Sequence, residues 1–156
     1  MAPSVSTLAG NGTAGSKDGK GDQAQFKSPK GVAKAANGTV IVADTDNHRI
    51  CVISPNGDVR IIAGTGVAGI SFCVSDLMPS FMKEPPNALS GHQDGPGSQA
   101  QFNSPTGVAC CADGTIIVAD YGNNRLRAIS PNGDVRTIAG TGVAGYLLTS
   151  DQVAKP

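Results

Sequence analysis

A long internal repeat constrains this chain more than any other feature of its sequence. Residues 24–69 and residues 100–145 align without a gap at an offset of 76 residues, and about 33 of the 46 aligned positions are identical. A third, partial copy opens the chain, because Val5–Gly10 (VSTLAG) matches Val59–Gly64 and Val135–Gly140. Self-similarity of this kind predicts one supersecondary unit per copy, with neighbouring units stacked on one another.

Each copy is predicted to contain four short strands separated by turns. In the first copy the strands cover residues 31–33, 39–43, 49–53 and 59–63, which are rich in Val, Ile and Ala. The turns carry Asn37-Gly38 and Pro55-Asn56-Gly57-Asp58, because Asn and Gly tolerate positive φ. Four antiparallel strands in about 40 residues describe a propeller blade. We therefore predict an all-β fold, a partial β-propeller made of two four-stranded antiparallel blades plus a leading outer strand.

This interpretation divides the chain into five segments. They are a leading strand and inter-blade loop (1–23), a first blade (24–69), an insertion (70–92), a second blade (93–145) and a truncated tail (146–156). The glycines that end the outer strands are 54 residues apart between Gly10 and Gly64, and 76 residues apart between Gly64 and Gly140. The insertion therefore adds about 22 residues. It is either a functional segment that caps a gap or a gene-model artefact with no role.

Two blades leave apolar faces uncovered and cannot close a ring, since closed propellers have about four to eight blades. Two explanations stay open. The chain is a fragment completed by the remaining blades of a longer propeller, or several copies self-assemble into a closed ring. We favour the fragment.

Charge and composition narrow the function classes. Lysine plus arginine (12) balances aspartate plus glutamate (12), which removes the long-range attraction to nucleic acid or to an anionic membrane. Residues 1–10 lack the basic and apolar regions of a signal peptide, and no apolar run approaches the roughly 18 residues of a membrane span. Four cysteines, two of them adjacent, show no CxxC spacing. We expect a cytoplasmic protein with reduced thiols.

Two polar clusters could be mistaken for catalytic sites. A catalytic constellation must converge on one substrate, whereas these clusters repeat once per copy. The repetition favours a structural role, in which each arginine makes charge-assisted hydrogen bonds to a carboxylate or to loop carbonyls. The residues are Asp44, Asn47 and Arg49, and Asp120, Asn123 and Arg125.

Loop positions that differ between the copies are the candidate binding residues, because rigid scaffolds present function on loops. They are Thr45, Asp46, His48, Tyr121 and Asn124.

No catalytic residue, cofactor or metal site is predicted. His48 and His92 are the two histidines of the chain, and no second His or paired Cys lies at ligand spacing. Three GxGxxG strings follow predicted strands, but no helix follows them, so they do not indicate a dinucleotide site. Asp18–Asp22 (DGKGD) lacks the ligand alternation of a calcium loop.

The phrases Val42–Ile50 (VADTDNHRI) and Val118–Leu126 (VADYGNNRL), each followed by an ISPNGDV turn, resemble NHL repeats of the six-bladed type of β-propeller. The stretches Asp18–Ala33 and Asp94–Ala109 are also typical of that family. The resemblance implies a non-catalytic module that acts as a protein–protein interaction scaffold. It leaves open RNA binding, for which the lysines of residues 17–34 and Tyr121 are the support, and a metal-dependent lyase or hydrolase, for which ligands are too few.

Overall fold

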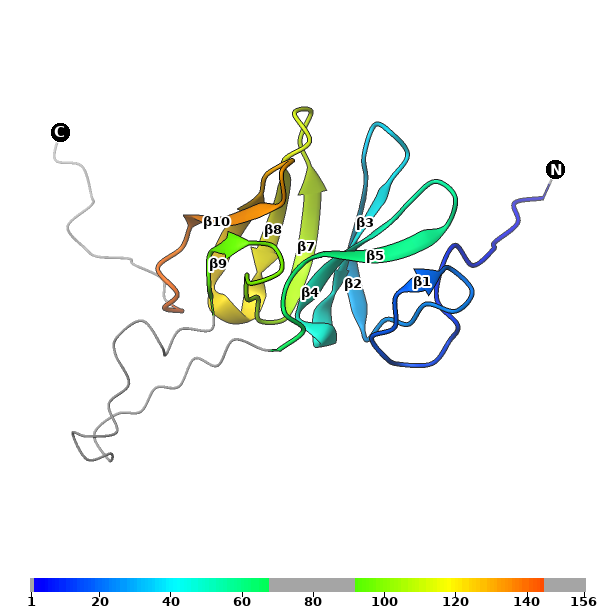
Figure 1. Ribbon diagram of the computed structural model, residues 1–156, viewed down its shortest axis with the longest axis horizontal. Coiled ribbons are helices and arrows are strands. Elements are labelled where there is room, and N and C mark those ends of the chain that lie inside the picture. The colour runs from blue at the N-terminus through cyan, green and yellow to red at the C-terminus, as the bar shows by residue number, and fades with distance from the viewer. Residues whose placement is uncertain (1, 68–91, 145–156) are drawn as a thin grey trace, which may run out of the picture.

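The computed structural model describes residues 2–67 and 92–144, and it shows one antiparallel sheet for each copy of the repeat (Figure 1). The first sheet has the order β1-β5-β4-β3-β2, and the second has the order β6-β10-β9-β8-β7. The strands of the first blade are β1 (Gly19–Lys20), β2 (Pro29–Lys34), β3 (Val40–Asp44), β4 (Arg49–Ile53) and β5 (Asp58–Ala63). Those of the second are β6 (Gly95–Pro96), β7 (Pro105–Cys110), β8 (Ile116–Asp120), β9 (Arg125–Ile129) and β10 (Asp134–Ala139).

The all-β prediction is confirmed, and each blade contains the four predicted strands as β2–β5 and β7–β10. A fifth, two-residue strand at the outer edge was not predicted. In the first blade Gly19 pairs with Val59, and in the second Gly95 pairs with Val135. Two residues carry no apolar alternation, so only the tertiary pairing reveals these strands.

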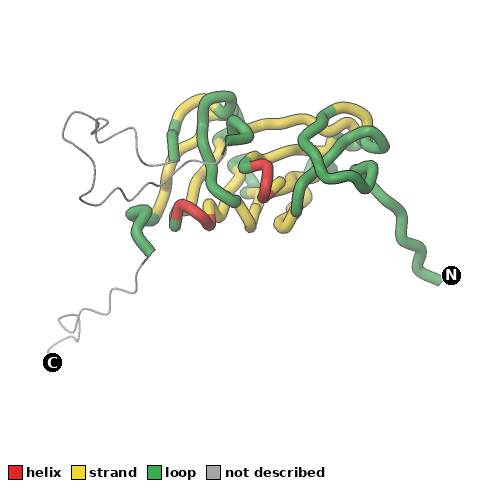
Figure 2. The backbone as a smooth tube through the Cα atoms, turned by 90° about the horizontal axis from the view of Figure 1, so that it is seen from below, coloured by secondary structure: helices red, strands yellow, loops and turns green. Residues whose placement is uncertain are grey.

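A one-turn 3-10 helix follows the second long strand of each blade, at the same end of both blades (Figure 2). These turns are η1 (Thr45–Asn47) and η3 (Tyr121–Asn123). Each ends in a left-handed residue that is not glycine, His48 with φ 50° and Asn124 with φ 50°. Asn is among the residues that tolerate this region, and His is enriched there as well.

The main core lies between the two blades. Side chains alternate along each strand, so one face of the first blade meets the opposite face of the second. The buried cluster joins Ile41, Ala43, Ile50, Val52 and Ala63 to Ala100, Phe102, Val118, Ile129 and Val135. The two blades therefore pack as one unit, with β7 against β2 and β3.

The leading segment occupies the position of an outer strand without pairing in a sheet. The Gly10 N–H donates to the Gly21 carbonyl (2.7 Å), and the Gly64 N–H, at the end of β5, donates to the Gly97 carbonyl (2.9 Å). Gly10 and Gly64 are equivalent in the repeat, and so are Gly21 and Gly97. The segment is not a strand because a strand needs a paired neighbour, and the rest of such a blade is absent from the described residues.

The whole of the predicted tail (146–156), and the predicted insertion (70–92) apart from His92, lie outside the described residues. Within the part of the chain that the structure describes, no helix has the length and apolar character needed to cross a membrane.

Candidate functional site

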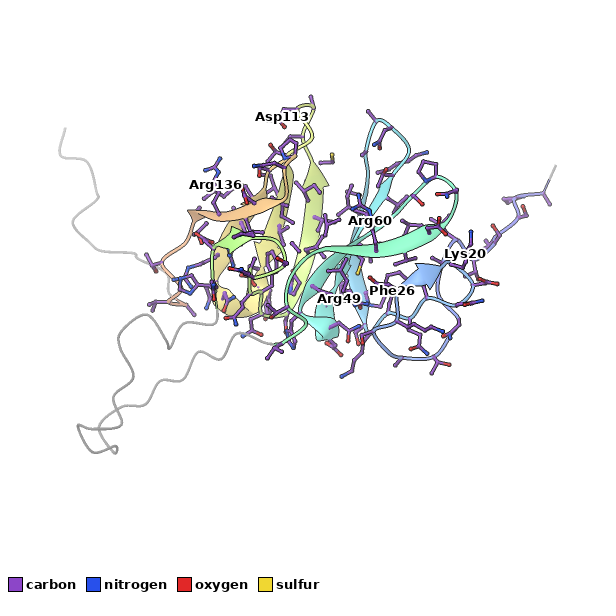
Figure 3. The ribbon with its side chains drawn as sticks, in the orientation of Figure 1. Lys20, Phe26, Arg49, Arg60, Asp113 and Arg136 are labelled. Atoms are coloured by element: carbon purple, nitrogen blue, oxygen red, sulfur yellow. The ribbon has the colours of Figure 1, made fainter. Side chains whose placement is uncertain are left out.

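The first polar cluster ties the leading loop to strands β3 and β4. Asp44 is fully buried, and its Oδ2 accepts hydrogen bonds from Arg49 Nε (2.7 Å) and Asn47 Nδ2 (2.8 Å). Its Oδ1 accepts from the Lys27 N–H (2.7 Å). Arg49 is itself 2% exposed, lies 3.3 Å from Asp18 Oδ1 and donates through Nη1 to a backbone carbonyl of the leading loop (Figure 3). A buried charge is tolerated when it is paired and hydrogen-bonded in this way.

The second cluster also pairs a buried carboxylate with a buried arginine, but its arginine is Arg127 and not Arg125, the counterpart of Arg49. Arg127, fully buried, donates to Asp120 Oδ2 (2.9 Å) and Asp94 Oδ1 (2.6 Å), and to the carbonyls of Gln93 and Gln101. Asn123 Nδ2 also donates to Asp120 (2.8 Å).

Arg125 is predicted to donate to a carboxylate or to loop carbonyls, and the structure shows the second of these bonds, while Arg127 binds the carboxylate. Arg125 is only half-buried and donates to the carbonyl of Thr141 (3.0 Å) instead of Asp120. Residues 125 and 127 lie on the same face of β9, because side chains alternate along a strand, so either could reach Asp120. In the first blade the place of Arg127 is taken by Cys51, and Arg49 pairs with the carboxylate.

Asp18 and Asp94 are cluster members that sequence reasoning missed, although both occupy the same position of the repeat. Asp94 Oδ2 accepts from the Thr137 N–H (2.9 Å), which anchors β10. Burial alone would raise the pKa of Asp94, but the hydrogen bond from Thr137 and the Arg127 guanidinium hold that pKa below its usual value. Asp18 makes the equivalent contacts with Arg49 and with the Ile61 N–H (3.0 Å), so each of the two carboxylates joins an arginine to the outer strand of its blade.

Thr45 does not lie on a binding surface, which corrects its prediction as a loop candidate. The side chain is 1% exposed, and its hydroxyl donates to the Pro105 carbonyl across the blade interface (2.7 Å). His48 is half-buried and also bridges the blades, since its Nδ1 accepts from the Ser104 N–H (3.0 Å). The variation between copies at these positions follows from packing: Thr45 and His48 have a blade beside them.

Burial lowers the pKa of His48 against the opposing attraction of Asp46, and Lys27 lowers it further. A lowered pKa agrees with the geometry, because only the neutral imidazole can accept a hydrogen bond at Nδ1.

The other loop candidates are exposed and lie at the 3-10 end of the blades. Tyr121 is 72% exposed, and Asp46 and Asn124 are exposed as well. Asp46 Oδ2 accepts from the Ser28 hydroxyl (2.7 Å), which orders the loop around it. We define the loop surface as Ser28, Asp46, Tyr121 and Asn124.

A groove of about 460 Å³ lies between the blades on the side of the β2–β3 and β4–β5 turns. Its lining combines apolar side chains, including Ile41 and Ile129, with polar ones such as Asn132 and Arg60, the last of which is labelled in Figure 3. No sequence motif marks it, since its residues come from three turns (β2–β3, β7–β8 and β9–β10) and from strands of both blades. Across the described residues, no group of three or more His, Cys, Asp or Glu side chains could hold a metal ion.

These features define two adjacent blades of a β-propeller, each built from an NHL-type unit. The family model described as the Teneurin NHL domain matches residues 23–130, and this chain belongs to that family. The chain is 33% identical to Teneurin-4 of Homo sapiens over 112 residues, which is 70% of this chain and 4% of that protein. It is 34% identical to NHL repeat-containing protein 2 of Bos taurus over 107 residues, which is 68% of this chain and 12% of that protein.

Solved structures agree with the fold. An auxiliary nutrient binding protein from Bacteroides thetaiotaomicron superposes with a TM-score of 0.52 at 22% identity, over 85% of this chain and 28% of that one. A protein of unknown function from the same organism superposes with a TM-score of 0.53 at 20% identity, over 72% of this chain and 23% of that one. This chain therefore spans a small part of each of these relatives.

Proposed function

We propose that this chain is a non-catalytic propeller module that acts as a protein–protein interaction scaffold. The observation that carries the proposal is the contrast between its buried and exposed polar groups. Asp44, Arg49, Asp120 and Arg127 direct their hydrogen bonds into the protein and are 0–2% exposed, so they do not face a substrate.

The loop surface has the composition of a recognition site. Tyr121 offers a large, rigid and exposed aromatic side chain, and tyrosine is enriched among residues that dominate binding energy. Asp46 adds an exposed carboxylate on η1, the turn of the first blade that is equivalent to the turn of Tyr121. Both turns are held by a buried ion pair, which supplies the rigid scaffold that a binding loop needs.

Charge reversal of one exposed aspartate tests the loop surface. The Asp46→Lys variant and the unchanged chain are immobilised, and the proteins that each retains from a cell extract are compared by mass spectrometry. Asp113→Lys is the matched control, because Asp113 is also exposed but lies in the β7–β8 turn, away from the 3-10 end (Figure 3). A protein retained by the unchanged chain and by Asp113→Lys, and lost with Asp46→Lys, supports the proposal.

Equal retention by all three forms, or retention of no protein, would contradict the proposal. A salt-dependent shift of RNA in a gel would instead favour nucleic-acid binding. Stoichiometric zinc or calcium in the purified chain would favour the metal-dependent enzyme.

A further inference from the structure

Each blade has one face buried against the other blade and one face that is exposed. Because the blades are copies, the exposed face of each blade is equivalent to the buried face of the other. Val32 in β2 is 68% exposed, whereas its counterpart Val108 in β7 packs against the core between the blades. Leu126 in β9 is 43% exposed, whereas its counterpart Ile50 in β4 is fully buried in that core. We call the open face of the first blade (Pro29, Val32, Val40) the leading face, and that of the second (Leu126, Ile138, Ala139) the trailing face.

A glycine in β7 shows that the trailing side of the second blade is shaped for another blade. Gly31 in β2 allows the Thr106 carbonyl of the second blade to approach so closely that a Cβ at Gly31 would clash with it. Gly107 is the counterpart of Gly31, but a Cβ there would only make an ordinary contact of 3.5 Å with Ala119. Neither glycine has positive φ, so the glycine at position 31 is explained by the close approach of the neighbouring blade. Gly107 likewise has no side chain, although no blade lies beside it in the described residues.

The polar groups that join the blades recur on the open faces. Between the blades, His48 Nδ1 accepts a hydrogen bond from the Ser104 N–H. The counterpart of His48 in the second blade is Asn124, whose Oδ1 is also an acceptor, and the counterpart of Ser104 in the first blade is Ser28. Ser28 and Ser104 even share the same left-handed backbone, with φ 49° and 48°. The trailing face therefore offers the acceptor, and the leading face offers the amide.

The leading segment makes hydrogen bonds on the leading face that a neighbouring blade would otherwise make. Between the blades, Gly64 and Thr65 donate to the carbonyls of Gly97 and Ala100. On the leading face, the backbone amides of residues 10 and 11 donate to the carbonyls of Gly21 and Ala24, the counterparts of that pair. Residues 10 and 11 are therefore an intramolecular cap over the edge of the leading face.

We propose that the trailing face binds the leading face of a second copy of this chain, in the arrangement of the internal blade interface. Gly140 and Thr141 of one copy replace residues 10 and 11 of the other at the Gly21 and Ala24 carbonyls. The contact is head-to-tail, so it forms rings where its rotation closes and filaments where it does not. Two to four copies would supply the roughly four to eight blades of a closed propeller.

Two residues differ between the internal and the inferred interface. Thr45 of the internal interface becomes Tyr121, and Thr106 becomes Lys30. A lysine ammonium over a tyrosine ring is a favourable contact, whereas a threonine has no such partner. The inferred interface shares Ser28, Tyr121 and Asn124 with the loop surface, but light scattering reports self-association whether or not the loop surface binds another protein.

Complementary variants test the proposal on the full chain. Val32→Glu places a charge on the leading face, and Leu126→Glu places one on the trailing face; both side chains are exposed, so the fold is expected to persist. Light scattering during size exclusion should show that the unchanged chain associates as its concentration rises and that each variant stays monomeric. A mixture of the two variants should form a one-to-one dimer, because one good face remains on each.

Release of the cap should strengthen the association. Gly10 has φ 105°, so Gly10→Val strains the cap and is expected to raise the association constant by about tenfold. Gly114→Val is the matched control, since Gly114 has φ 85° in a turn away from both faces. Gly107→Ala gives a second block of the trailing face, because its Cβ would make only an ordinary contact of 3.5 Å with Ala119 within the chain, and it should act like Leu126→Glu.

Each other outcome overturns the proposal. If Gly10→Val and the unchanged chain remain monomeric at every concentration, the open faces belong to other blades of a longer chain. If the chain associates but the mixed variants fail to pair, the contact is not head-to-tail. Circular dichroism of every variant verifies that loss of association is not loss of the fold.

Discussion

Replacing Arg127 with methionine should remove a large share of the stability of the fold. The guanidinium is fully buried, pairs with the fully buried Asp120 and with Asp94, and lies 5.1 Å from the centre of the Phe102 ring. Methionine has a similar length but leaves Asp120 as an unpaired buried charge. Breaking a buried ion pair from one side costs about 3–5 kcal/mol. Small domains have a total stability of about 5–15 kcal/mol, so the effect is large on that scale.

Urea-induced unfolding followed by circular dichroism measures the change. Arg125→Met is the matched control on the same strand, because Arg125 is half-buried and makes one hydrogen bond to the Thr141 carbonyl. Its free energy of unfolding should change by about 0.5 kcal/mol or less. A loss below about 1 kcal/mol for Arg127→Met would refute the reasoning, since it would mean either that Asp120 does not need a cationic partner or that Arg125 replaces Arg127 beside it.

The first blade suggests a rescue that sharpens this test. Arg127→Cys recreates the local sequence of the first blade, where a cysteine at this position leaves Arg49 to pair with Asp44. Arg125 should then take over Asp120, so Arg125→Met should cost several times more in the Arg127→Cys background than alone. Additive effects of the two substitutions would show that Arg125 cannot reach the carboxylate.

Three further predictions concern the blade interface and the thiols. The lowered pKa of His48 means that its hydrogen bond stabilises the folded state above the ordinary pKa of 6.5 and that this contribution is lost as the pH falls below it. His48→Asn should remove that part of the pH dependence of unfolding, about 0.5 kcal/mol after solvent screening, and an unchanged pH profile would contradict it. Gly31→Ala should destabilise the fold by about 1–3 kcal/mol in thermal unfolding, because its Cβ clashes with a β7 carbonyl, whereas Gly107→Ala should change little; equal effects would count against the interface. Burial raises the pKa of Cys51 to about 12, so iodoacetamide should label the exposed Cys111 much faster at pH 8, and equal labelling by peptide mass spectrometry would be inconsistent with a buried thiol.

Most of the fold was accessible from the sequence because its signals are local. The turn dipeptide Asn37-Gly38 and its counterpart mark the hairpins, since positive φ is required there irrespective of the rest of the protein. Apolar runs such as Val40–Ala43 identify buried strands, and this signal is local because it lies within the run itself. The site was less accessible, because a loop position that varies between copies can be either exposed, as Tyr121 is, or buried, as Thr45 is.

The sequence by itself determined the repeat, the strands, the turns and the short-range part of each polar cluster. The strands, the turns and these cluster residues depend on neighbours within a few residues, and the repeat is visible as identity between the two copies. Only the tertiary structure decided that Arg127 fills the second cluster in place of Arg125, that Thr45 joins the two blades, and that the leading segment takes the seat of an outer strand. Each of these depends on the distance in space between groups that are not neighbours along their own strand or turn. Two arginines on one face of a strand are equivalent in sequence, and the position of Asp120 in space distinguishes them.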